Sequence, residues 1–437
     1  MCSMLHRTGA ELFVRDIALT LHQRGHSITV YAPFMGDMVE ELQARCIACV
    51  TELRQVAQAP EIIIGNTRDE TVAAMAQFLD VPVISICHDR TAPHGRPPQF
   101  TRIRQHIAVD ENCAERLYLE NGIERSAVKI VSNGVDVHRF RKRPPLPEKP
   151  LKAAIFSNYS TEHQHTSAIR CACNELGISL DVIGSGVGRQ DKSPELTLAH
   201  YDLVFAKARC AMEAMAVGSA VILYNEGMGL AGMVNSRNIE EWHRWNFGRR
   251  LLQKPVQMSS VIEAIQQYDA VDADSVSSYV REHISLDATV DALERIAYQV
   301  LHDEAALPKS HPAMEIREFS RFLMESQHPL GSHQTAVQLG IQHEKIAALN
   351  EVIGQLQQQL QLQHQLEEQR QEQEVLQQQQ QRQGQEVRDA RLAELQQELH
   401  LANELVSGLK QEVLALRNSR SWRLTAPVRW LASKFSI

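Results

Sequence analysis

A chain of 437 residues is longer than one ordinary domain, so its length predicts two globular units with an extension. The net charge of −8 gives no indication of a large basic surface for nucleic acid, so we expect no nucleic-acid partner. No apolar run approaches the ~18–20 residues of a membrane span and no signal peptide is evident, so we expect a cytoplasmic protein. The eight cysteines lack zinc-ligand spacing, which predicts reduced thiols and no metal site.

The first 140 residues alternate helices with short apolar strands. An amphipathic helix spans 9–24, and strands are expected at 27–31, 61–65, 83–86, 106–109 and 128–131. This alternation predicts an α/β fold with a doubly wound parallel sheet. A mononucleotide-binding unit normally begins with a strand, yet only MCSMLHRT precedes the first helix. We therefore expect either an unusually short first strand or a true start further upstream.

Residues 141–150, RKRPPLPEKP, are rich in proline and charge and predict a linker to a second α/β domain at 151–330. Strands are expected there at 153–156, 180–183, 203–205 and 220–223, and helices over 261–267 and 289–302 complete the domain. Open α/β sheets bind ligands at the carboxyl ends of their strands. Gly184, in the cluster GSGVG, follows such an end and would let a ligand approach the backbone closely.

The stretch from Phe205 to Leu223 combines a strand, a basic turn, a helix and a second strand. Lys207 and Arg209 lie at the start of the helix, where backbone N–H groups already favour anions. The pattern therefore predicts a site for a phosphate-sized ligand. The alternative is an ordinary buried βαβ step that binds nothing.

From about residue 334 the composition changes to Gln, Glu and Leu. Apolar residues keep heptad spacing at both ends of 334–418, most regularly from Leu392 to Leu416, with a polar middle between them. This spacing predicts a coiled coil, and therefore a homo-oligomer or a helical partner protein. The alternative is a solitary helix packed on the globular part.

The last segment, 419–437, carries basic residues without an acidic side chain. Its tryptophans and apolar helical face predict a basic amphipathic helix at an anionic membrane surface, and the alternative is docking to a partner protein. The expected membrane-contact residues are Trp422, Arg423, Leu424, Arg429, Trp430, Leu431 and Phe435.

Three elements follow one another in the chain: GAELFVRDIALTLHQRGHSITVY, SNGVDVHRF and AMEAMAVGSAVIL. Together they resemble the retaining family-4 glycosyltransferases, whose GT-B fold has two Rossmann-like domains, over roughly residues 5–300. SRSWRLTAPVRW after a coiled coil is similar to the C-terminal ends of bacterial glycosyltransferases that build O-antigen and other surface polysaccharides. The resemblance implies transfer of a sugar from a nucleotide donor to a lipid-linked glycan acceptor, at the cytoplasmic face of the inner membrane.

The resemblance also implies roles for single residues. His88 is expected near the transferred sugar, and Glu213 is expected to accept hydrogen bonds from the ribose, so these two are the candidate catalytic residues. For His88, the alternative is a hydrogen-bonded histidine at a strand end. Asn133 and Gly134 belong to the NGVD element at the domain boundary, and the alternative for these two residues is a tight turn. The expected nucleotide-sugar contacts are Gly9, Asn133, Gly134, Gly184, Lys207, Arg209 and Glu213.

Two departures from the family pattern leave a second function open. The first glutamate of the family's paired-glutamate motif falls on Phe205, and the family's Arg and Lys are absent after the strand at 153–156. In the enzyme hypothesis, Lys207 and Arg209 supply the charge that the leaving diphosphate needs. The alternative is a non-catalytic scaffold tethered by its coiled coil to a membrane-bound assembly. The resemblance implies that no metal is needed. Asp272-x-Asp274 matches the metal-binding DxD string of other transferases, but it lies in the surface-like stretch DAVDADS, so we interpret it as a helix cap.

Overall fold

The computed structural model describes residues 1–158, 160, 164–189, 191, 193–306, 312–327 and 393–410. They fall into two units, Met1–Glu315 and Ile316–Ile437. The predicted membrane segment 419–437, with Trp422, Trp430 and its other expected contacts, lies outside the described residues, as does most of the predicted coiled coil. In the described part of the chain, no helix is long and apolar enough to cross a membrane.

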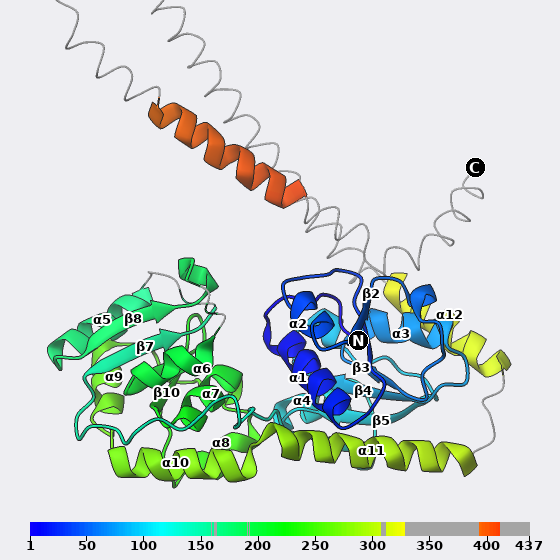
Figure 1. Cartoon of the computed structure of the whole chain (residues 1–437), viewed down its shortest axis with the longest axis horizontal. Coiled ribbons are helices and arrows are strands. Elements are labelled where there is room, and N and C mark those ends of the chain that lie inside the picture. The colour runs from blue at the N-terminus through cyan, green and yellow to red at the C-terminus, as the bar shows by residue number, and fades with distance from the viewer. Residues whose placement is uncertain are drawn as a thin grey trace, which may run out of the picture. The chain divides into compact units, whose positions relative to one another are not determined.

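The N-terminal α/β domain alternates helices and strands as predicted (Figure 1). Its strand pairs are all parallel, with β1 beside β2 and a second group in the order β3-β4-β5-β6. The elements are α1 (Gly9–Gln23), β1 (Thr29–Tyr31), α2 (Val39–Gln43), β2 (Ala48–Val50), β3 (Ile63–Gly65), α3 (Arg68–Gln77), β4 (Val83–Cys87), β5 (Ile103–Ala108), α4 (Glu111–Glu115) and β6 (Val128–Ile130).

The first residues of the chain lie between these two groups of strands. The Met1 nitrogen donates to the carbonyl of Ile64 at 3.0 Å, and the amide of Asn66 donates to the Met1 carbonyl at 3.3 Å. On the other side, the amide of Cys2 donates to the carbonyl of Tyr31 at 3.1 Å. The segment therefore joins β1 to β3 in the place where the alternation predicts a first strand.

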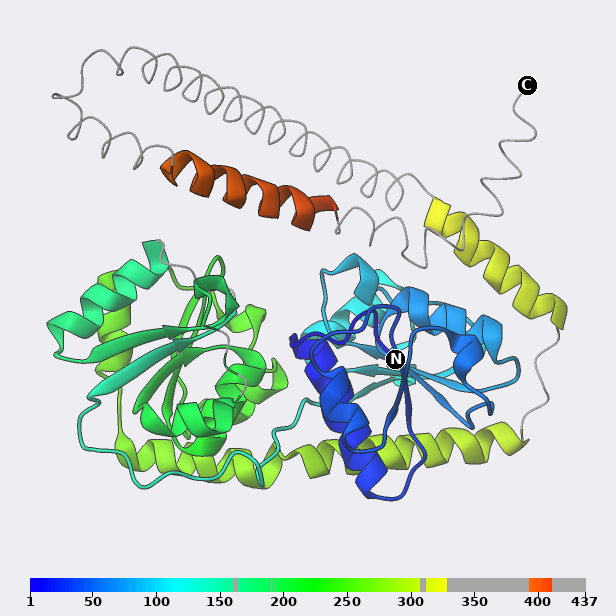
Figure 2. The ribbon, with the colours of Figure 1, turned by 45° about the horizontal axis from the view of Figure 1, so that its top comes forward.

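The C-terminal α/β domain, drawn in green in Figure 2, contains one sheet. Its strand order is β11-β10-β9-β7-β8. Its strands are parallel except β11, which pairs antiparallel with β10. One face of the sheet packs against α7 and α10, and the other packs against α5 and α9. The elements are β7 (Lys152–Phe156), α5 (Gln164–Glu175), β8 (Ser179–Ile183), α6 (Pro194–Thr197), β9 (Leu203–Ala206), α7 (Ala208–Val217), β10 (Ala220–Asn225), β11 (Gly229–Met233), α8 (Ile239–Arg244), α9 (Met258–Ile265) and α10 (Ala270–His283).

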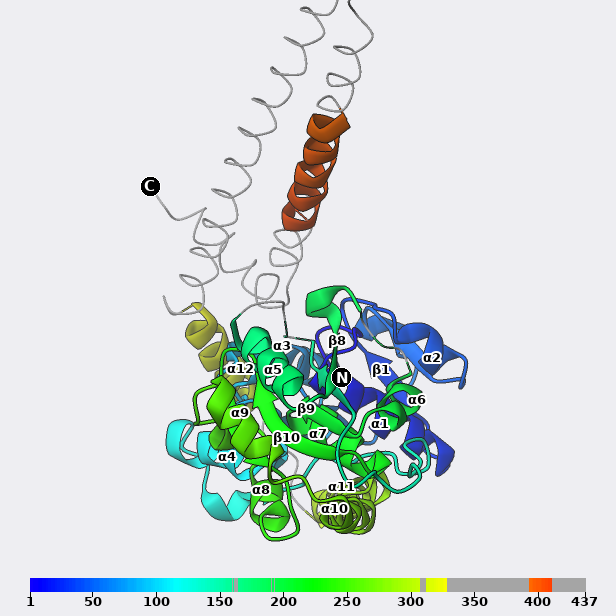
Figure 3. The same cartoon turned by 90° about the vertical axis from the view of Figure 1, so that its left-hand side faces the viewer.

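The helix α11 (Leu286–Ala306) continues nearly in line with α10, as Figures 1 and 3 show, and returns to the N-terminal domain. Leu293 and Ile296 of α11 lie in one core with Phe13 and Ile17 of α1. The prediction that this helix completes the second domain is therefore wrong. Helical periodicity identified its buried face but carries no information on which domain covers that face. The helix α12 (Pro312–Gln327) follows.

Residues 393–410 form a helix of the second unit. Leu395, Ala402 and Val406, which fall on the predicted heptad seam, are buried, whereas Leu401 and Leu405 between them are exposed. The predicted seam is thus the buried face of this helix, while the coiled coil as a whole stays a prediction.

Candidate functional site

The turn between β9 and α7 places two cations at the start of a helix that ends in the C-terminal domain core. Lys207 is the N-cap residue of α7 and makes no side-chain capping bond there. Gly218 ends the helix in the left-handed conformation with φ of +99°, which favours glycine. The Lys207 ammonium lies 3.5 Å from the sulfur of Met228, and burial lowers the pKa of Lys207.

Arg209 joins carboxylates from both α/β domains. Its Nε donates to Oε1 of Glu213, one turn further along α7, at 2.7 Å. Its Nη2 donates to Oδ2 of Asp16 on α1, which belongs to the N-terminal domain. All three side chains are largely buried, with exposed fractions of 15% for Arg209, 8% for Asp16 and 7% for Glu213. Against the effect of burial, the two carboxylates raise the pKa of Arg209.

The two carboxylates differ in how well they are compensated. Asp16 also accepts hydrogen bonds from Arg15, at 2.8 Å from Nε and 2.5 Å from Nη2. Although burial opposes it, the pairing with Arg209 and Arg15 holds the pKa of Asp16 below its ordinary value. Burial raises the pKa of Glu213, because one guanidinium does not offset the loss of solvent. Removal of Arg209 would therefore affect Glu213 more than Asp16.

The backbone is strained where α7 begins. Ala208, Asn246 and Phe247 are non-glycine residues with φ between +48° and +51°. The amide of Ala208 donates to the carbonyl of Phe247 at 2.9 Å, which ties the two strained segments together. Strain of this kind concentrates at functional sites, so it marks the start of α7 as a candidate.

Two buried asparagines near these segments have unsatisfied side-chain atoms. Asn225 ends β10, whose Leu223 pairs with Ala206 of β9, and Asn225 therefore lies at the sheet edge where Lys207 follows β9. It is 1% exposed, and its Nδ2 has no hydrogen-bond partner among the described residues. The Oδ1 of Asn246 is also buried, and no described residue hydrogen-bonds it. A buried amide without a partner requires an explanation, and a ligand atom at this edge would provide one.

His88 follows β4 in the N-terminal domain. Its Nε2 lies 2.7 Å from Oδ1 of Asn66, and its ring packs edge-on against Phe13 of α1 with the centroids 4.8 Å apart. Burial lowers the pKa of His88 to about 4, so the imidazole is neutral at pH 7. Phe13 and Asp16 lie one turn apart on α1, so this helix contacts both His88 and Arg209.

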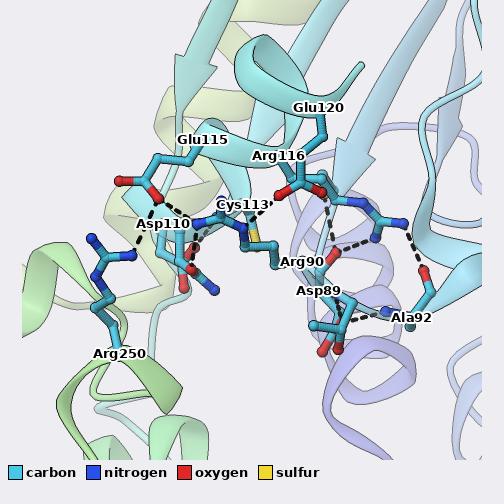
Figure 4. A network of polar contacts seen from close by, with 12 residues as sticks. Asp89, Arg90, Ala92, Asp110, Cys113, Glu115, Arg116, Glu120 and Arg250 are labelled. Carbon is cyan, nitrogen blue, oxygen red and sulfur yellow. Dashed lines mark hydrogen bonds and ion pairs between the residues drawn. The ribbon is translucent and has the colours of Figure 1, made fainter.

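The loop after His88 is held by a network of charged side chains (Figure 4). Arg116 donates to the carbonyl of Asp89 at 2.5 Å, and Arg90 pairs with Glu115. Arg250 of the C-terminal domain reaches the same Glu115 at 3.4 Å. The network therefore fixes the segment that carries His88 and adds a second charged contact between the two domains.

The glycines expected at the site have different surroundings. Gly9 begins α1, is exposed and would have open space around an added Cβ. A Cβ on Gly184, which has φ of +153°, would lie 2.0 Å from the carbonyl oxygen of Ser157. A Cβ on Gly134 would lie 2.4 Å from the carbonyl oxygen of Ser285. Gly184 and Gly134 thus serve close backbone packing, and only Gly9 leaves room for a ligand.

The structure brings some of the predicted residues together and separates others. Lys207, Arg209 and Glu213 share the start of α7, as the sequence implied. Asn133 belongs instead to the crossing toward α11, where the amide of Val135 donates to the carbonyl of Ile284 at 2.9 Å. Its Oδ1 is buried, with no hydrogen-bond partner in the part of the chain that the structure describes.

Sequence reasoning missed Asp16, Asn66 and Asn225. The signal for Asp16 was present, since Arg15 and Asp16 stand as a charged pair within the apolar run FVRDIAL. Asn66 and Asn225 left no comparable signal in the sequence.

Two further expectations concern acidic positions. Phe205, which occupies the place of the family's first glutamate, is fully buried in β9 and packs edge-on against Tyr224. The helix cap expected at 272–274 is wrong in its residue, because Asp269 caps α10 by accepting from the amides of Val271 and Asp272. Among the described residues, no cluster of His, Cys, Asp or Glu side chains could hold a metal ion.

Two Rossmann-like domains, with charged side chains at the strand ends of the second, form the predicted GT-B type of α/β architecture. Residues 7–139 match the sequence profile described as Glycosyltransferase Family 4. The match agrees with the predicted family over the N-terminal domain. The curated proteins include no match to the chain.

Several solved structures are similar to the chain at low sequence identity. A glycosyltransferase from Rickettsia africae ESF-5 has a TM-score of 0.49 and 12% identity, covering 68% of this chain and 97% of its own. WaaG, a glycosyltransferase involved in lipopolysaccharide biosynthesis, has a TM-score of 0.41 and 13% identity; the match covers 67% of this chain and 97% of WaaG. The lipopolysaccharide outer core galactosyltransferase WaaB has a TM-score of 0.38 and 11% identity; the match covers 64% of this chain and 96% of WaaB. These scores are low, so the fold assignment rests on the strand order and connections.

Proposed function

We propose that the chain is a retaining glycosyltransferase that moves a hexose from a nucleoside-diphosphate donor to a glycan acceptor. The proposal depends on the arrangement of charged side chains at the start of α7. There Lys207 is the N-cap residue of the helix, and Arg209 pairs with Glu213 and with Asp16 of the N-terminal domain. The site joins a cationic turn and a helix N-terminus, both suited to a diphosphate, with a carboxylate suited to a ribose.

Within the described part of the chain, Arg209 and Glu213 each keep an atom for a ligand. The guanidinium of Arg209 uses Nε and Nη2 for its two carboxylates, and Nη1 remains for a phosphate oxygen. Glu213 uses Oε1 for Arg209, and Oε2 remains for a ribose hydroxyl. Lys207 supplies a further positive charge. In glycosyl transfer the diphosphate leaves with growing negative charge, so cations fixed at this position would lower the barrier.

Calorimetry tests the phosphate role of Lys207. We expect at least one of UDP, GDP and ADP to bind the full chain, and Lys207→Ala to lower the affinity for that nucleotide about tenfold. The affinity for the matching nucleoside, which lacks phosphate, should fall much less. Lys152→Ala is the matched control. Lys152 begins β7, so it lies at the amino ends of the parallel strands, whereas Lys207 follows the carboxyl end of β9. Equal losses for nucleotide and nucleoside would refute the phosphate role.

We further propose that the acceptor is a lipid-linked glycan of the bacterial surface and that the protein acts on the cytoplasmic face of the inner membrane. The resemblance of 419–437 to the ends of surface-polysaccharide transferases supports this proposal, as does the basic amphipathic character of that segment. A single segment of this kind binds weakly. A coiled coil over 334–418 would gather several copies and increase the avidity.

The second candidate function is a non-catalytic scaffold. The burial of Phe205 favours it, because no carboxylate can face the donor sugar from that position. The absence of the family's Arg and Lys after β7, in the stretch SNYSTEHQ, also favours it. The two functions differ in one outcome. A scaffold would turn over no nucleotide sugar, even with a lipid-linked acceptor present.

A further inference from the structure

Asn66 is the one described residue that hydrogen-bonds the His88 ring, and it comes from the neighbouring strand end. Oδ1 of Asn66 lies 2.7 Å from Nε2 of His88. Asn66 follows β3, His88 follows β4, and these two strands pair in parallel. The contact therefore lies at the carboxyl edge of the N-terminal sheet, where open α/β sheets bind their ligands.

The orientation of the Asn66 amide follows from its second contact. Its Nδ2 donates to the carbonyl oxygen of Met1 at 3.1 Å. A carbonyl oxygen can only accept, so the NH₂ group must face Met1 and the amide oxygen must face His88. The oxygen in turn can only accept, so Nε2 of His88 must carry the proton.

We infer that Asn66 is a positioning residue that holds His88 as the Nε2–H tautomer, which leaves Nδ1 as a hydrogen-bond acceptor. In a neutral imidazole one nitrogen donates and the other accepts, so fixing Nε2 as the donor fixes Nδ1 as the acceptor. No described residue hydrogen-bonds Nδ1, and His88 is only partly buried. The edge contact with Phe13 restricts rotation of the ring.

The chemical consequence concerns the class of group that His88 can meet. A bare Nδ1 accepts from a hydroxyl, so His88 would orient a sugar O–H and would not donate a proton to a departing oxygen. The low pKa of His88 agrees with this assignment, because a neutral ring retains the acceptor at pH 7. This consequence rests on the proposed function, whereas the tautomer itself does not.

Nitrogen-15 NMR of histidine-labelled full chain tests the tautomer directly, with His88→Gln to assign the signals. We expect a protonated Nε2 and an unprotonated Nδ1 in the wild type. Asn66→Leu removes the acceptor at nearly constant volume, and His88 should then shift toward a mixture of tautomers. The signals of His106, a buried histidine on β5 of the same sheet, should stay unchanged and report an intact fold.

An Nδ1–H tautomer in the wild type, or an unchanged His88 in folded Asn66→Leu, would overturn the inference. If Asn66→Leu does not fold, Asn66→Asp replaces it. A carboxylate beside Nε2 favours the imidazolium, so His88 should become protonated near neutral pH, and a neutral Nδ1–H ring would again overturn the inference. Turnover of a nucleotide sugar should fall on the order of tenfold in Asn66→Leu, with less change in nucleotide affinity. Absence of turnover in the wild type would count against the proposed function and leave the NMR result standing.

Discussion

Arg209→Met should destabilise the protein because it leaves a buried carboxylate without its counter-charge. Arg209 is the one guanidinium that contacts Glu213 in the described structure, whereas Asp16 keeps Arg15 at 2.5 Å. Breaking a buried ion pair costs about 3–5 kcal/mol. Since one of the two carboxylates stays paired, we expect a loss of about 3 kcal/mol in the free energy of unfolding at pH 7.

Arg244→Met is the matched control. Arg244 also connects the two domains, through Glu111 at 3.3 Å, but its side chain is 64% exposed. Exposed ion pairs contribute about 0–1 kcal/mol, so this variant should unfold nearly as the wild type does. Urea unfolding followed by circular dichroism measures both variants.

The cost of Arg209→Met should also depend on pH. Glu213 already has a raised pKa, and without Arg209 its pKa should rise further. When the pKa of a carboxyl group is higher in the folded than in the unfolded state, the folded state holds a proton that the unfolded state releases. Stability therefore falls as pH rises above the unfolded pKa. The variant should therefore lose less stability at pH 5 than at pH 8. A cost no larger than that of Arg244→Met, or one that grows as pH falls, would refute the reasoning.

Three further predictions concern packing, acid stability and location. Gly134→Ala should destabilise by about 1–3 kcal/mol in urea unfolding, whereas Gly9→Ala should not, and equal effects would contradict the packing argument. Burial lowers the pKa of His106 to about 4, so the fold loses stability as pH falls below 6.5. His106→Gln should remove about 2 kcal/mol of that loss at pH 5. Identical pH profiles of stability for the variant and the wild type would exclude this role of His106. Deletion of 419–437 should move the protein from the membrane to the soluble fraction, and unchanged fractionation would refute the membrane proposal.

Local patterns predicted the parts of the fold that local forces determine. The helix at 9–24 and the step from β9 through α7 to β10 follow from apolar spacing and from Gly218 as a helix stop. The short strand β2 and the antiparallel β11 were not predicted. β11 is rich in glycine, whose low strand propensity hides it, and antiparallel pairing is unusual in a sheet built from βα units.

The candidate site was predicted only where its residues are neighbours in the chain. Lys207, Arg209 and Glu213 share one helix start, so the sequence showed them together. The partner of Arg209, Asp16, lies 193 residues away, and no periodicity reports a contact at that separation. The same holds for α11, whose apolar stripe was recognised while the domain that it packs against was not.

Turnover of a nucleotide sugar tests the central claim most directly. The full chain would be incubated with UDP-, GDP- and ADP-sugars and a bacterial lipid-linked glycan, and the release of nucleoside diphosphate and the transfer of sugar would be measured. The proposed function predicts transfer from at least one donor, and a loss of about 100-fold in Glu213→Gln, which keeps the volume but removes the charge. Binding of a nucleoside diphosphate without turnover of any donor would contradict the enzyme and favour the scaffold.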